Sequence, residues 1–108
     1  MEKMKFENPK FHRGLNCTVR LGEKWKKRLN IGDKFLVDGM EKFWSMNVSK
    51  ILVCKLEKLK ENDIKFEHDP KCRTVRGLRK ELIHVYPNNR IGNDIIVTVV
   101  YFNVEKLS

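Results

Sequence analysis

The sequence predicts an α+β domain in which a curved or closed sheet packs against one main helix. Three observations support this prediction. Strand-like stretches of apolar residues are separated by short turns. Only one segment, between residues 70 and 87, has the spacing of a long amphipathic helix. The 108 residues fit a single domain, and 41% of them are hydrophobic, which is enough to form a core.

The first half of the chain predicts two strands, a short helix and the start of a hairpin. Residues 16–21 alternate polar and apolar side chains, as a half-buried strand does. Residues 23–30 are helix formers with an apolar pair at i, i+4, so we expect one or two helical turns. The turn 31–33 precedes a strand over 34–37, and Asp38-Gly39 is a typical hairpin turn.

A long return strand is predicted from Phe43 to Leu56. Its apolar residues fall on both sides of a two-residue period, which indicates burial on both faces. Lys50 interrupts the pattern and indicates either a β-bulge or a basic side chain pointing into a cleft. Residues 59–66 form a polar connection with room for a helical turn.

The second half predicts the main helix and a central strand. Asp69 is placed to cap the helix, and Pro70 to occupy its first position. The helix ends at Pro87, and its apolar stripe consists of Val75, Leu78, Leu82 and Val85. After a loop over 88–93, residues 95–104 are β-branched and aromatic on both faces, which indicates a strand inside the sheet.

The charge of the chain favours a polyanionic partner. Lys and Arg total 23 against 14 acidic residues, which gives a formal net charge of +9. The excess is uneven: residues 10–34 hold eight basic and two acidic residues, and residues 69–90 hold six and two. Such clusters attract nucleic acid by counterion release. The alternative is a solvated surface that only confers solubility.

The cysteines and histidines do not predict a metal or disulfide site. Cys17, Cys54 and Cys72 are widely spaced and odd in number, so we expect small core residues and neither a disulfide framework nor a metal clamp. The histidines lack ligand spacing, and no cofactor is expected. The first ten residues have no apolar h-region, and no stretch is long enough to span a membrane, so we expect a cytoplasmic protein.

Three segments have the order and spacing of known motifs. Residues 13–20 (RGLNCTVR) are similar to the motif G-x-K-x-x-T-x-R in its Thr and Arg positions. Residues 31–33 are similar to I-G-D, and residues 78–87 (LRKELIHVYP) to a helix with a Tyr-Pro turn before a last strand. Together they resemble the ASCH domain family of the PUA-like group, over residues 11–104.

This resemblance implies the fold in more detail. The family has a small PUA-like β-barrel, here of about five or six strands, with one main helix and one or two short helices. It implies one domain over residues 11–108, preceded by an N-terminal extension of residues 1–10. In this fold the first strand runs along a cleft between the barrel and the helix, and RNA binding is generally inferred for that cleft.

We therefore predict a nucleic-acid-binding domain, with RNA the expected partner and a basic cleft beside the first strand. An arginine held on a strand suits a planar contact with phosphate or a base edge, although a strand arginine can instead form a salt bridge. One or two of Trp25, Phe43, Trp44 and Tyr86 would stack on bases. The candidate binding residues are Arg13, Thr18, Arg20, Lys24, Lys27, Lys50, Arg73, Arg76 and Arg79.

A second function implied by the resemblance is hydrolysis. Small bacterial members remove the acyl group from N-acetylated cytidine, chemistry attributed to a Lys and a Thr of the first-strand motif and a downstream Glu. Thr18 matches, but the Lys position falls on Leu15 or Asn16, and the acid has only Glu67 and Asp69 as candidates. A threonine hydroxyl without a neighbouring base is a poor nucleophile, so the sequence disfavours an enzyme.

A third hypothesis is an interaction protein for an acidic partner. Both this function and RNA binding are electrostatic, so salt dependence does not separate them. A pull-down with and without nuclease does, because only the RNA-mediated capture is lost after digestion. The sequence says nothing about oligomeric state.

Overall fold

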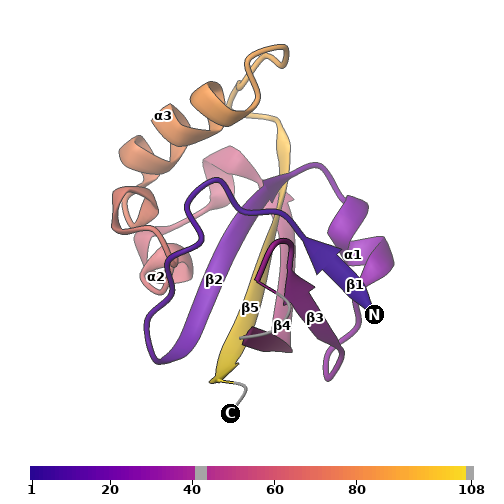
Figure 1. The fold of residues 1–108 in the computed structure, drawn as a ribbon. Helices are drawn as coiled ribbons and strands as arrows, with labels where there is room; N and C mark the ends of the chain where they lie inside the picture. The colour runs from indigo at the N-terminus through magenta and orange to yellow at the C-terminus, as the bar shows by residue number, and fades with distance from the viewer. Residues whose placement is uncertain (41–43, 107–108) are drawn as a thin grey trace.

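The computed structural model describes residues 1–40 and 44–106, which form one mixed sheet with three helices (Figure 1). The strands are β1 (Glu2–Met4), β2 (Gly14–Leu21), β3 (Lys34–Val37), β4 (Trp44–Lys55) and β5 (Ile96–Lys106). The helices are α1 (Lys24–Arg28), α2 (Glu61–Ile64) and α3 (Val75–Val85), with short 3₁₀ helices over Leu56–Lys58 and Pro70–Cys72. The α+β class and the strand–helix order match the prediction.

The sheet has the order β1-β3-β4-β5-β2 and is open. β1 pairs with β3 in parallel, and the other pairs are antiparallel. The predicted closed barrel is therefore wrong. β1 extends the sheet beyond β3, whereas the outer edge of β2 meets the loop that follows α2. There Cys17 N–H donates to the Phe66 carbonyl at 2.9 Å, and His68 N–H donates to the Cys17 carbonyl at 3.0 Å.

β5 is the central strand, as its two apolar faces predicted. It lies between β2 and β4. Val97, Val99 and Tyr101 join one apolar core, which α2 and α3 cover, while Val100 and Phe102 join a second core with residues of α1, β1 and β3. Because both faces are covered, a polar substitution on this strand would leave an unpaired group in one core or the other.

The predicted break in the long return strand is a β-bulge. The register of β4 against β5 shifts between Val48 and Lys50, and Ser49 Oγ donates to the Tyr101 carbonyl at 3.3 Å. Lys50 is exposed, with its Nζ 5.2 Å from the centre of the Tyr101 ring. The start of the strand predicted at Phe43, and the side chain of Trp44, lie outside the described residues.

The main helix begins later than predicted. Asp69 caps only the short 3₁₀ helix, where its Oδ1 accepts from Lys71 N–H at 3.1 Å. Thr74 is extended and interrupts the segment, and its Oγ1 accepts from Gly77 N–H at 3.1 Å to cap α3. The prediction of a continuous helix from Pro70 is therefore wrong. Asp69 and Thr74 each cap the start of a separate helix, so the segment divides into a 3₁₀ helix and α3. The predicted end before Pro87 is confirmed.

The first ten residues contribute to the sheet and to its core. β1 was not predicted, although Met4 and Phe6 have the two-residue spacing of a strand. Met4 is fully buried and Phe6 is 8% exposed. The segment after β1 then crosses to the α2 side of the sheet before the chain enters β2 (Figure 1). In the part of the chain that the structure describes, no helix has the length and apolarity to cross a membrane.

Candidate functional site

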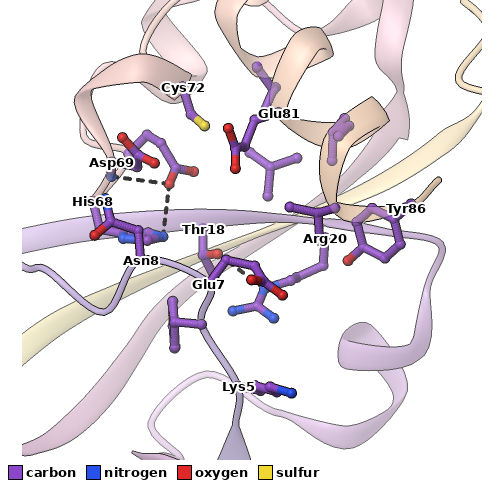
Figure 2. Close-up of a pocket in the computed structure, with 16 residues that line it drawn as sticks. Lys5, Glu7, Asn8, Thr18, Arg20, His68, Asp69, Cys72, Glu81 and Tyr86 are labelled. Carbon is purple, nitrogen blue, oxygen red and sulfur yellow. Dashed lines mark hydrogen bonds and ion pairs between the residues drawn. The ribbon is translucent and has the colours of Figure 1, made fainter.

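A pocket of about 240 Å³ opens at the outer edge of β2 (Figure 2). Its walls are the N-terminal segment 5–8, residues 18–20 of β2, the segment 67–69 and the inward face of α3. The apolar part of the lining consists of Phe6, Val19, Cys72, Leu78, Leu82 and Val85. The site therefore gathers the N-terminal segment and residues 67–86 around one edge strand.

Arg20 is fixed within this pocket by two contacts. Its Nε donates to Thr18 Oγ1 at 3.1 Å, and its guanidinium carbon lies 4.5 Å from the centre of the Phe6 ring. Burial lowers the pKa of Arg20, an effect that the nearby Tyr86 and Glu67 oppose. A guanidinium stacked on a ring and held at Nε is pre-organised to bind a planar partner through its terminal nitrogens.

Glu67 is the most buried acid of the site, at 2% exposure. Its Oε1 lies 3.0 Å from His68 Nε2 and accepts from Asp69 N–H at 3.3 Å. Burial raises the pKa of Glu67 to about 8, although hydrogen bonds from the backbone of Asp69 and Val19 favour the ionised form. Near neutral pH this carboxyl is therefore mainly protonated.

The hydrogen bonds of His68 are consistent with a neutral pair. Its Nδ1 lies 3.2 Å from the Lys10 carbonyl, which only accepts, so Nδ1 carries a proton. Burial lowers the pKa of His68 to about 4, so the ring is neutral and Nε2 accepts. The Glu67 carboxyl then donates its proton to His68 Nε2, and the two buried side chains satisfy each other without a net charge.

The charged lining of the pocket is mixed rather than basic. The acids are Glu7, Glu67, Asp69 and Glu81, and the bases are Lys5 and Arg20. The cleft beside β2 thus differs from the basic cleft that the sequence predicted. Cys72 also lines it, but burial raises its pKa to about 12, so this thiol is not a nucleophile near neutral pH.

The structure brings together five residues that sequence reasoning had singled out. Thr18, Arg20, Glu67, Asp69 and Tyr86 all line the pocket. Thr18 and Arg20 are two residues apart on β2, which places both on the same face of the strand. Glu67 and Asp69 reach the pocket because their segment pairs with β2 at Cys17.

Two of the predicted binding arginines hold the fold instead of facing this pocket. Arg73 Nε donates to the Glu67 carbonyl at 3.0 Å, which fixes the segment that carries the site. Arg79 Nη1 and Nη2 donate to the Ile91 carbonyl at 3.1 Å and to Asn93 Oδ1 at 2.6 Å. Arg73 thus ties the end of the 3₁₀ helix to the segment 67–69, and Arg79 ties α3 to the loop that follows it.

The remaining predicted cations are exposed and lie outside the pocket lining; they are Arg13, Lys24, Lys27, Lys50 and Arg76. Of the aromatic residues that the sequence singled out, Trp25 is buried on the inner face of α1 and Tyr86 lines the pocket. Phe43 and the side chain of Trp44 fall outside the described residues.

Neither residue at the motif's lysine position reaches the pocket. Asn16 is buried and folds the preceding loop, because its Nδ2 donates to the His12 and Gly14 carbonyls at 2.7 and 3.1 Å. Leu15 packs against a core. Lys5, from the N-terminal segment, supplies a lysine to the pocket instead.

Sequence reasoning missed the N-terminal contribution to the site. Phe6, Glu7 and Asn8 line the pocket with Lys5, and Glu81 reaches it from α3. The only signal was the alternation of Met4 and Phe6, which indicates a strand but not its partner. No group of His, Cys, Asp and Glu in residues 1–40 and 44–106 has the arrangement of a metal site.

Comparisons with known proteins support the fold. No family model and no curated protein matches the sequence. An ASCH domain from Lactobacillus crispatus JV V101 is similar in structure, with a TM-score of 0.64 at 10% identity over 85% of this chain and 65% of that chain. Protein EF3133 from Enterococcus faecalis V583, of the DUF984 family model, gives 0.57 at 16% identity over 85% and 61%.

A third solved structure matches over almost its whole length. The hypothetical protein PH0355 gives a TM-score of 0.62 at 16% identity and covers 97% of both chains. By contrast, this chain spans less than two thirds of the length of the first two structures. The agreement concerns the backbone architecture, because all three identities are low. The chain therefore has the fold of an ASCH domain.

Proposed function

We propose that the chain binds single-stranded RNA and holds one nucleobase in the pocket beside β2. The observation that carries this proposal is the combination of apolar walls with the fixed guanidinium group of Arg20 and the ring of Tyr86. Bases of single strands are recognised by stacking and by hydrogen bonds to their edges. The volume of about 240 Å³ is below the roughly 300–1,000 Å³ of sites for drug-sized ligands, and suits a single base.

The distribution of charge assigns different parts of the RNA to different surfaces. Carboxylates in the pocket repel the negative charge of a phosphate group, whereas they do not repel an uncharged base. The exposed cations Arg13, Lys24, Lys27 and Arg76 and the net charge of +9 support contacts with the sugar–phosphate backbone outside the pocket. In this arrangement the base gives selectivity and the surface gives salt-dependent affinity.

Filling the pocket tests this function. Val85 lines it from α3, and Val85→Trp is expected to weaken binding of a short single-stranded RNA about tenfold or more, since stacking alone contributes roughly 1–3 kcal/mol per base. Fluorescence anisotropy with a labelled heptanucleotide measures the affinity. Ile83→Trp is the matched control, because Ile83 is on the same helix and 53% exposed. Equal affinity of the two variants would contradict base insertion.

A second candidate function is hydrolysis of an N-acylated nucleoside in the same pocket. The specific observation is that Thr18, Glu67 and Lys5 all line it. In this chemistry the Thr18 hydroxyl attacks the acyl carbon while Glu67 takes its proton. The C–N bond then breaks as a proton passes to the departing amine, and water cleaves the resulting ester to release Thr18 and the acid.

The pH dependence tests the second function. Glu67 acts as a base only when ionised, so turnover of N-acetylcytidine is expected to rise with pH through about 8, the raised pKa of this carboxyl. Thr18→Val, which removes the nucleophile, is expected to abolish turnover, while the exposed Lys24→Ala leaves it unchanged. Release of acetate followed by chromatography measures the rate. No turnover at pH 9 by the unmodified chain would eliminate the hydrolase.

A further inference from the structure

The terminal nitrogens of Arg20 are free to bind a ligand. Its Nε is taken by Thr18 and one face of the guanidinium by Phe6. Within the described part of the chain, Nη1 and Nη2 have no hydrogen-bond or ion-pair partner. Because the two contacts fix the plane, these nitrogens form a rigid donor fork. Such a fork pairs best with two adjacent acceptors on a flat partner.

Glu7 provides a free carboxylate beside this fork. It is exposed, lines the pocket and lies in front of the Arg20 side chain in Figure 2. Its charge opposes the fall that burial causes in the pKa of Arg20. No hydrogen bond or ion pair engages Glu7 among residues 1–40 and 44–106. The other carboxylates differ, because Asp69 and Glu81 both lie within 4 Å of Lys71 Nζ, at 3.8 and 3.6 Å.

An arginine fork next to a carboxylate is complementary to guanine. The O6 and N7 atoms of guanine are adjacent acceptors that arginine binds bidentately. Its N1–H and N2–H₂ groups are adjacent donors, which match a carboxylate. Adenine places a donor beside N7, uracil separates its carbonyls by an N–H, and cytosine offers only its amino group to the carboxylate. Guanine alone presents both an acceptor pair and a donor pair.

We infer that the pocket selects guanine, with Arg20 on O6 and N7 and Glu7 on N1 and N2. This inference rests on the proposed binding of RNA. Its probe is a set of labelled heptauridines in which the central base is uracil, adenine, cytosine or guanine. Guanine is expected to bind about tenfold more tightly than the others, in line with the discrimination from one bidentate pair. Measurements at one salt concentration keep the phosphate contribution constant.

Modified bases assign each contact separately. A central 7-deazaguanine lacks the N7 acceptor and is expected to lose most of the preference. Arg20→Lys keeps the charge but removes the fork, and in this variant guanine and 7-deazaguanine should bind equally. A central inosine lacks the N2 amino group, and the difference between guanine and inosine should vanish in Glu7→Gln. The exposed Arg90→Lys, outside the pocket lining and the proposed backbone contacts, is the control and should keep both differences.

The outcomes distinguish the two proposals. Binding that depends on Arg20 and on an unfilled pocket, yet is equal for all four central bases, would overturn the guanine assignment and leave the RNA function. A preference for cytosine or adenine would overturn it as well. Binding that is insensitive to both Arg20→Lys and Val85→Trp would instead overturn the proposed function, because neither the fork nor the pocket would then contact RNA.

Discussion

Glu67→Gln is expected to stabilise the fold by about 2 kcal/mol at pH 7. The folded state holds Glu67 protonated, because burial raises its pKa from 4.5 to about 8. Between these values the unfolded chain releases a proton that the folded chain keeps. The contribution of Glu67 to the free energy of unfolding is therefore fully present below pH 4.5, and it is lost as the pH rises through about 8. Glutamine has the shape of the protonated acid and does not titrate, but its amide cannot both donate to His68 Nε2 and accept from Asp69 N–H at the Oε1 position, which costs about 1 kcal/mol.

Chemical denaturation at several pH values measures this effect. The variant should be slightly less stable than the unmodified protein near pH 4.5, and its relative stability should rise steadily between pH 4.5 and about 8. His68 has the opposite sign, since its pKa falls from 6.5 to about 4 and its contribution is lost as the pH drops through that value. The unmodified protein is therefore expected to be most stable near pH 5–6, between the acid-side loss of stability from His68 and the alkaline-side loss from Glu67.

Glu81→Gln is the matched control for this prediction. Glu81 also lines the pocket, but it is partly exposed and pairs with Lys71, whose side chain is 67% exposed. Its replacement should change stability by less than about 1 kcal/mol. A variant Glu67→Gln that is less stable than the unmodified chain at pH 7 would mean that Glu67 is ionised in the fold and pairs there with Arg20.

Gly77→Ala is expected to destabilise the chain by about 3 kcal/mol, although alanine is the better helix former. Gly77 lies in the first turn of α3, where a Cβ atom would be 2.0 Å from the Lys71 carbonyl oxygen and 3.0 Å from Thr74 Oγ1. The nearer atom belongs to the backbone and moves only with the 3₁₀ helix. The overlap therefore outweighs the roughly 1 kcal/mol gained in helix propensity.

Thermal unfolding measures this cost, and a loss of roughly 15 °C in Tm is expected for a domain of this size. Gly92→Ala is the control, because the Cβ atom there would meet only the flexible carboxylate of Asp94, at 3.2 Å. It should leave Tm almost unchanged. Equal Tm values for the two variants would show that α3 shifts away from Lys71 without cost.

The sequence predicted most elements because their signals are local. The turn at Asp38-Gly39, the bulge near Lys50 and the two-faced final strand depend on neighbours within a few positions, and each agrees with the structure. Barrel closure is different, because it depends on whether the two outermost strands pair. That pairing joins residues far apart in the sequence, so no short pattern reports it. β1 adds to β3 instead and leaves the sheet open.

The site was predictable only in part, for the same reason. Thr18 and Arg20 were found because they share one strand face and one motif. The contribution of Glu7 could not be inferred, since it depends on how the segment after β1 crosses the sheet. Charge counting does not place side chains: Arg73 and Arg79 add to the basic total but donate to backbone or loop acceptors rather than facing the pocket.

The pairing of the segment 66–68 with β2 has a consequence for solubility. An edge strand with unpaired N–H and C=O groups is a template for strands of other molecules. Here the Phe66 carbonyl and His68 N–H occupy the outward groups of Cys17, and the Glu67 carboxyl covers the N–H of Val19. The segment that lines the pocket therefore also prevents the edge of the sheet from pairing with strands of other molecules. Variants that displace this segment will expose β2 to intermolecular strand addition.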